Sequence, residues 1–220
     1  MNKMGSVFTA ILLSAILASP GFAQNLTAGV KAGIDLADLG GDFEDLIETS
    51  TDLKTGFSVG GFLGIDLHRL FRLQGELQYV QKGAKATEGG SELKFKVDYI
   101  EVLVPLTLMI PVEGSLAPRL YVGPSLAFEM DCKVKGEVDG QSVEFACDSD
   151  EVGAPTNTTD YGIVFGGGID IVAGPGALTL DVLYNLGLGD IAKEDPTDPV
   201  VKVTNRNIQI LVGYGFRFGS

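Results

Sequence analysis

Residues 208–218 read IQILVGYGFRF, and every second residue of this stretch is large and apolar. Glutamine, leucine, glycine and arginine stand between those apolar residues. Successive side chains of a β-strand point to opposite faces, so a period of two predicts a strand with one apolar and one more polar face. The stretch therefore predicts an amphipathic strand rather than a helix.

The same alternation recurs along the rest of the chain. It is found in seven further blocks, at residues 26–36, 57–67, 72–79, 100–110, 120–130, 161–171 and 178–188. Most blocks span about 11 residues, whereas a soluble strand averages about five or six residues and a tilted transmembrane strand needs about nine to eleven. The lengths favour strands that cross a membrane.

The fourth block contains two irregularities. Lys96 and Asp98 fall on its apolar parity, which predicts a bulge near residues 98–101. Pro105 lies within the same block and donates no backbone hydrogen bond, which predicts a further local irregularity.

The connections between the blocks differ systematically in length. They are long at 37–54, 131–160 and 189–206, of medium length at 83–94, and short at 68–71, 111–118 and 173–177. Long loops at one end and tight turns at the other are typical of outer-membrane barrels. The sequence predicts an all-β fold, an eight-stranded antiparallel up-and-down transmembrane β-barrel, with its first and last strands beginning and ending at the periplasmic side.

The N-terminus has the features of a secretory signal peptide. A lysine at position 3 precedes an apolar run over residues 7–17, and small residues precede a break after Ala23. We expect a signal peptide at residues 1–23 and one barrel domain at residues 24–220. Together with the strand pattern, this predicts the cell outer membrane as the location.

The polar face of the blocks is expected to line a narrow lumen. The apolar face carries too many bulky side chains to fill the interior of an eight-stranded barrel, so lipid is its expected partner. A soluble lipocalin-like barrel, with its apolar side inside, is the alternative. The predicted lumen charges are Lys31, Asp35, Arg72, Glu76, Glu129, Asp170, Asp181 and Arg217.

Aromatic residues of the outward parity gather near the ends of the blocks. Amphipathic rings favour the headgroup level of a membrane, so two girdles are expected there. The ordinary preference of aromatic residues for strands explains their presence but not this clustering. The predicted girdle residues are Phe57, Tyr79, Phe128, Tyr161, Phe216 and Phe218.

Composition excludes several classes of function. The formal net charge of −13 argues against nucleic-acid binding, which needs clustered basic residues. The single histidine and two cysteines are too few for a closed zinc site. His68, in a short turn, is expected to be a solvated turn residue. We predict no catalytic residues, metal or cofactor, and therefore no enzyme.

Six segments resemble the outer membrane β-barrel domain of the PorT-like proteins. They are residues 71–83 (FRLQGELQYVQKG), 99–102 (YIEV), 121–124 (YVGP), 160–163 (DYGI), 183–188 (LYNLGL) and 212–218 (VGYGFRF). The resemblance implies an eight-stranded barrel in the outer membrane. It implies little chemistry, although some relatives serve a protein-secretion and gliding apparatus.

The loop at 131–160 contains both cysteines. Asp139-Gly140 is a strong hairpin signal. Counting outward from that turn pairs Val138 with Gln141 and places Cys132 opposite Cys147. Paired strand positions are close enough for a disulfide, and an exported protein lies in an oxidising compartment. We predict a Cys132–Cys147 disulfide that stiffens the hairpin.

Acidic residues are concentrated in the long loops, six of them in 37–54 and eight in 131–160. These loops are expected either to bind divalent cations or a protein of the envelope or cell exterior, or simply to be solvated. The favoured function is a monomeric barrel with a structural or interaction role through these loops. A component of a transport or secretion apparatus, a narrow pore, a hydrolase or lipid-modifying enzyme at the barrel rim and a soluble ligand-binding barrel remain alternatives.

Overall fold

A computed structural model describes residues 26–41, 53–88, 91–138, 141–149, 156–192 and 203–218. The predicted signal peptide lies outside these residues. The strands are β1 (Leu26–Gly41), β2 (Lys54–His68), β3 (Phe71–Glu88), β4 (Ser91–Leu103), β5 (Leu106–Met109), β6 (Leu116–Val138), β7 (Gln141–Ala146), β8 (Thr159–Ala173), β9 (Gly176–Gly187) and β10 (Val203–Phe218).

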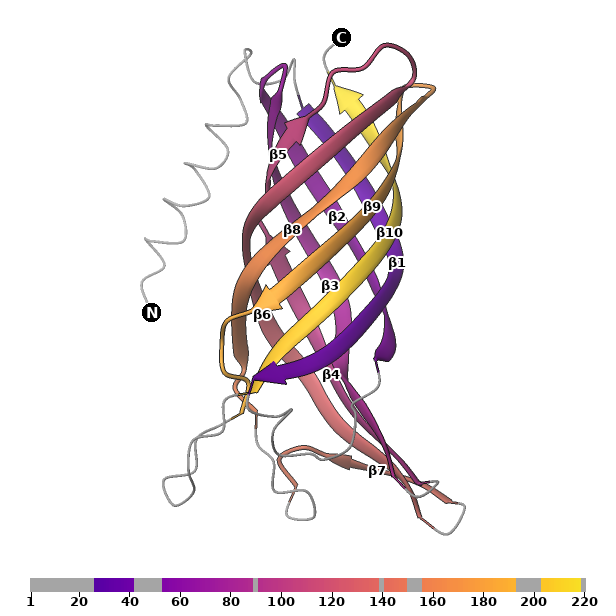
Figure 1. Ribbon diagram of the computed structural model, residues 1–220, viewed down its shortest axis with the longest axis vertical. Coiled ribbons are helices and arrows are strands. Elements are labelled where there is room, and N and C mark those ends of the chain that lie inside the picture. The colour runs from indigo at the N-terminus through magenta and orange to yellow at the C-terminus, as the bar shows by residue number, and fades with distance from the viewer. Residues whose placement is uncertain are drawn as a thin grey trace, which may run out of the picture.

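The strands close into a ring (Figure 1). Strands that follow one another in the chain pair antiparallel, except β4 with β5 and β7 with β8, and β1 pairs β10 from Leu26↔Phe218 to Gly41↔Val203. Of the ten strands, β4 and β5 share one place between β3 and β6, and β7 pairs only β6, so eight places make the ring. The prediction of an eight-stranded up-and-down barrel is confirmed.

The fourth place in the ring is irregular, as predicted. Between Asp98 and Tyr99 the register of β4 against β6 skips Met130, so β6 carries one extra residue there. The strand then divides at Pro105, whose carbonyl accepts a hydrogen bond from the amide of Gln74 (3.0 Å) although the ring nitrogen donates none. The missing donor at Pro105 explains why β4 ends at Leu103 and β5 begins at Leu106.

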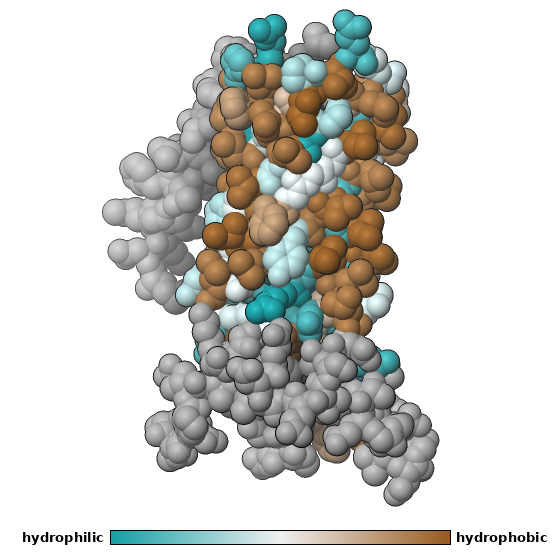
Figure 2. All heavy atoms as spheres, in the orientation of Figure 1, coloured by the Kyte–Doolittle hydropathy of each residue, from teal (hydrophilic) through white to brown (hydrophobic). Residues whose placement is uncertain are grey.

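Side chains alternate between the two faces of the ring. Along β9, Leu178, Leu180 and Val182 are exposed, whereas Thr179 and Asp181 between them are buried. In Figure 2 the apolar colour covers most of the visible wall of the barrel. The large apolar residues therefore face outward, and the alternative of a soluble barrel with an apolar interior is wrong.

The two ends of the barrel differ. At one end, which we call the short-turn end, residues 69–70, 110–115 and 174–175 connect the strands, and Leu26 and Phe218 lie there. Gly174 has a φ of 61°, a left-handed conformation that glycine adopts without strain, and so permits the tight β8–β9 turn. At the other end, which we call the long-loop end, β1 ends at Gly41 and β10 begins at Val203.

Three strands extend beyond the ring at the long-loop end. β3 has 18 residues and β6 has 23, about twice what a membrane crossing needs. β3 and β4 pair as far as Glu88↔Ser91, so the prediction of a connection at residues 83–94 is wrong. β6 likewise continues to Val138 and turns back as β7, with Val138 opposite Gln141 as the hairpin count predicted.

Candidate functional site

Arginine and aspartate side chains fill the lumen near the short-turn end. Arg119 pairs with Asp170 and, at 2.6 Å, with Asp181. Arg72 contacts Asp66 at 2.6 Å and Asp170 at 3.7 Å. Both guanidinium groups are buried, so each cation is neutralised by carboxylates of other strands, some of them across the lumen, rather than by water.

Lys31 occupies the middle of the lumen. Its Nζ lies 2.9 Å from Glu76 Oε1 and 3.2 Å from Asp181 Oδ2, and it stands 5.0 Å above the ring of Phe62. The ring fits because Gly29 has no side chain, since a Cβ there would lie 2.5 Å from two ring atoms. Small residues and long charged ones thus pack together in a narrow interior.

A second buried network lies closer to the long-loop end. Lys82 Nζ lies 2.7 Å from Glu101 Oε1, and both side chains are 2% exposed or less. Glu101 also accepts hydrogen bonds from Gln78 (2.9 Å) and Asn185 (2.6 Å). The ammonium group of Lys82 lies 5.4 Å from the ring centroid of Tyr99. Three strands, β3, β4 and β9, meet in this network.

Two buried aspartates in the same half are held by amides. Asn207 donates a hydrogen bond of 2.5 Å to Asp35, and Asn205 donates one of 2.8 Å to Asp160. One oxygen of each carboxylate lacks a hydrogen-bond partner, as does Nε2 of Gln209.

The predicted lumen residues differ in how deeply they are buried. Lys31, Asp35, Arg72, Glu76, Asp170 and Asp181 are buried in it, whereas Glu129 is half-buried toward the long-loop end. Arg217 is exposed at the short-turn end, where it lines the mouth of the barrel. Its parity points inward, but it is the second-last described residue of β10, where solvent reaches the mouth.

Three central lumen residues were missed, namely Lys82, Glu101 and Arg119. The alternation of the third block, continued beyond residue 79, would have reached Lys82. That of the fifth block, continued back from Tyr121, would have reached Arg119. Glu101 lies in the strand whose bulge obscured the parity.

The predicted girdle residues lie on the outer surface. Phe57, Phe128, Tyr161, Phe216 and Phe218 are exposed, and Tyr79 is partly buried. The rings of Phe57 and Tyr79 pack at a centroid distance of 5.4 Å. The contact of these rings with lipid headgroups stays a prediction.

The β6–β7 hairpin is fastened in two ways. Cys132 and Cys147 form a disulfide with their Cα atoms 5.5 Å apart, and the bridge packs against Val97 and Tyr99. Glu144 forms ion pairs with Lys135 (2.5 Å) and Lys133 (3.2 Å).

The ion pairs of the hairpin shift the titration of its exposed groups. Hydrogen bonds from Lys135 and Lys133 lower the pKa of Glu144. Hydrogen bonds to Asp131 and Glu144 raise the pKa of Lys133. The carboxylate of Glu144 and the ammonium group of Lys133 therefore stabilise each other in their charged forms, although solvent screens exposed pairs of this kind.

The chain has one histidine, His68, which is the residue where a catalytic role would first be sought. His68 is exposed at the end of β2, and its Nδ1 accepts a hydrogen bond of 3.4 Å from the backbone amide of Leu70. Within the described ranges no three His, Cys, Asp or Glu side chains are grouped so as to hold a metal ion.

No helix among the described residues is long and apolar enough to cross a membrane. Most of the acids predicted for the long loops lie outside the part of the chain that the structure describes.

Three solved structures illustrate what the chain is similar to. Neisserial surface protein A has 17% identity and a TM-score of 0.49, over 87% of this chain and 97% of that chain. OprG from Pseudomonas aeruginosa has 10% identity and a TM-score of 0.48, over 88% and 97%. Ail, the attachment invasion locus protein of Yersinia pestis, has 13% identity and a TM-score of 0.43, over 87% and 99%.

The family comparison is more decisive. No curated protein matches the chain. The sequence model of the outer membrane protein beta-barrel domain matches residues 22–193, which is most of the chain. The chain belongs to the outer membrane protein beta-barrel domain family, and it is a protein of the outer membrane.

Proposed function

We propose that the barrel is a closed anchor that holds an interaction surface outside the cell. The observation that carries this proposal is the lumen, where Lys31, Lys82, Arg72 and Arg119 are each paired with a carboxylate. Breaking one buried pair costs about 3–5 kcal/mol. An open pore would require several such pairs to separate at once.

The interaction surface is the extension at the long-loop end. The backbones of β3, β4, β6 and β7 pair there in sequence, which makes a four-stranded sheet outside the ring. The disulfide and the ion pairs of Glu144 hold its last hairpin in one conformation. A rigid surface binds a partner with less loss of conformational entropy than a mobile loop. The acidic residues that the sequence concentrates in the long connections would favour a partner with a basic surface.

Electrical recording tests the closed lumen. Purified protein in planar lipid bilayers should give no stable open current, while a porin added to the same bilayers shows that insertion is detected. A stable open current from the folded barrel would contradict the anchor and favour a narrow pore or a transport component.

Crosslinking in cells tests the interaction surface. A photoreactive residue in place of Phe145, which is 40% exposed on β7, should crosslink to one discrete protein. The adduct should weaken when Cys132 and Cys147 are both replaced by serine. A matched photoreactive residue in place of Leu180, on the lipid-facing wall, should give no such adduct. Equal labelling from both positions, or none from the hairpin, would contradict the proposal.

The finer assignments belong to the same proposal. The resemblance to PorT-like proteins rests on six strand motifs, and it keeps a role beside a secretion apparatus as the second candidate. We also propose that residues 1–23 are removed on export, that the mature barrel is a monomer, and that it has no catalytic activity. Mass spectrometry of the mature protein in detergent gives both the cleavage site and the stoichiometry.

A further inference from the structure

The mouth of the barrel at the short-turn end holds a pocket of about 550 Å³. Its polar walls are Arg69 from the β2–β3 turn, Arg217 from β10, Arg72 from β3, and Asp66 and His68 from the end of β2. Met109, at the end of β5, lies across the ring from β10. The pocket therefore spans the mouth rather than a groove between two strands.

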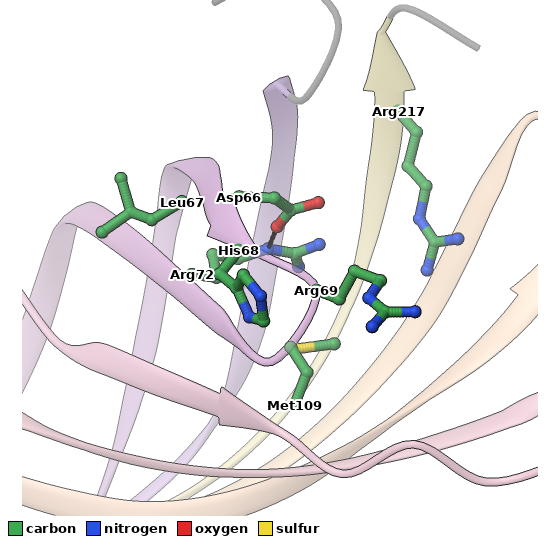
Figure 3. Close-up of a pocket in the computed structure, with 7 residues that line it drawn as sticks. All are labelled: Asp66, Leu67, His68, Arg69, Arg72, Met109 and Arg217. Carbon is green, nitrogen blue, oxygen red and sulfur yellow. Dashed lines mark hydrogen bonds and ion pairs between the residues drawn. The ribbon is translucent and has the colours of Figure 1, made fainter.

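The arginines of this pocket differ in what they contact. Arg72 is held by Asp66 at 2.6 Å and by Asp170 at 3.7 Å. Arg69 and Arg217 are exposed and form no ion pair or side-chain hydrogen bond with any described residue. Figure 3 shows both side chains reaching into the space of the mouth from separate elements.

The charges below the pocket are already matched. In the adjoining half of the lumen, Lys31, Arg72 and Arg119 face three carboxylates, those of Glu76, Asp170 and Asp181. At the mouth itself, Asp66 is the carboxylate among the seven residues of the lining. Arg69 and Arg217 therefore leave the mouth with an excess of positive charge, in a chain whose net charge is −13.

We propose that this mouth binds a phosphate group. Guanidinium groups present planar pairs of N–H donors that match phosphate oxygens, and charge-assisted hydrogen bonds of this kind are about twice as strong as neutral ones. Arg69 and Arg217 supply the free donors, and His68 adds a further polar group on the same wall. The phosphate belongs either to a phospholipid headgroup of the periplasmic leaflet or to a soluble phosphate of the periplasm.

The position of the pocket suits both sources. Phe216 and Phe218 are exposed on the outer wall at the same end, where the predicted girdle meets the headgroups. Leu67, another lining residue, is 57% exposed and points away from the mouth in Figure 3. A lipid with its acyl chains along this wall could place its phosphate at the rim, and a soluble phosphate could enter from below.

Phosphorus NMR titration of the purified, folded barrel in a nonionic detergent tests this site. The probes are inorganic phosphate and dihexanoyl phosphatidylglycerol below its micelle concentration. We expect saturable binding that weakens about tenfold or more in the Arg69→Gln/Arg217→Gln variant, since each lost charge-assisted hydrogen bond is worth about a factor of ten. Arg72 is left unchanged because it holds the lumen network together.

A second variant controls for charge alone. Lys133→Gln/Lys135→Gln removes the same charge from the opposite end and should bind both probes as the unaltered protein does. Heat-modifiable gel mobility verifies that both variants are folded. Stronger binding of the lipid than of inorganic phosphate identifies the headgroup as the source, and equal binding identifies a soluble phosphate, so both results support the site. Absence of saturable binding, or equal losses in the two variants, would overturn it.

Discussion

At the scale of single residues, the lumen of the barrel is filled by charged side chains. Burying each charge costs desolvation free energy, which is offset only when a side chain of opposite charge lies beside it. Lys82 and Glu101 are nearly inaccessible to solvent, and Glu101 also accepts two amide hydrogen bonds. Removing one partner leaves the other as an uncompensated buried charge. The lumen therefore has a specific arrangement rather than a generally polar character.

Lys82→Met should make this dependence measurable. The substitution keeps the length of the side chain but leaves Glu101 without its cation, so we expect the free energy of unfolding to fall by about 3–5 kcal/mol. Urea titration monitored by heat-modifiable gel mobility measures it. Lys133→Met, which removes an exposed cation of the hairpin, is the control and should change little. Equal effects of the two substitutions would argue against a buried network.

The glycines of the lumen give a second prediction at this scale. A Cβ at Gly29 would lie 2.5 Å from the ring of Phe62, whereas one at Gly75, on the outer wall, meets nothing within 4 Å. Gly29→Ala should lower the free energy of unfolding by about 1–3 kcal/mol through overpacking. Gly75→Ala should leave it nearly unchanged in the same urea titration. If Gly29→Ala is tolerated equally well, the lumen is less tightly packed than described.

At the scale of the elements, the β6–β7 hairpin shows how a local sequence determines a local structure. The sequence alone predicts its turn, its residue pairing and the proximity of its cysteines, because a two-residue turn fixes the register of the residues on both sides. The pairing of Val138 with Gln141 and the disulfide agree with that count.

The strand ends could not be predicted in the same way. Residues 83–94 were expected to be a connection because apolar alternation stops there, but the strands continue beyond the ring. Outside a membrane neither face needs to be apolar, so the period disappears while the backbone pairing persists. Arg217 shows a second limit of the alternation pattern. The pattern predicts which face of the strand a side chain is on, but not how far along the barrel axis it lies or how exposed it is.

Removal of the disulfide should loosen the hairpin and spare the ring. For the Cys132→Ser/Cys147→Ser variant, the chain-entropy model gives a local loss of about 3 kcal/mol for a loop of this length. Limited proteolysis should cut within residues 131–149 faster than in the oxidised protein, while the gel mobility of the folded barrel stays the same. Equal cleavage rates would show that backbone pairing, of β6 with β4 and of β7 with β6, is enough to fix the hairpin without the disulfide.

At the scale of the whole molecule, two surfaces of opposite character define the protein. The outer wall is apolar and suits lipid, and the inner wall carries the paired charges. Within the part of the chain that the structure describes, the extension at one end and the mouth at the other are the surfaces left for contact with molecules other than lipid chains. This division explains why the fold could be predicted from the two-residue alternation of apolar and polar side chains. The partners of the protein could not be predicted in this way, because they would contact loops and rims whose sequences do not alternate.

Tryptophan fluorescence tests the outward apolar wall most directly, because the chain contains no tryptophan of its own. Leu180→Trp places the fluorophore on the middle of β9, and Phe145→Trp places it on the hairpin outside the ring. In bilayers of brominated phospholipid, strong quenching is predicted for the variant at 180 and little for the variant at 145. Absence of quenching at position 180 in the folded barrel would contradict the assignment of this wall to lipid.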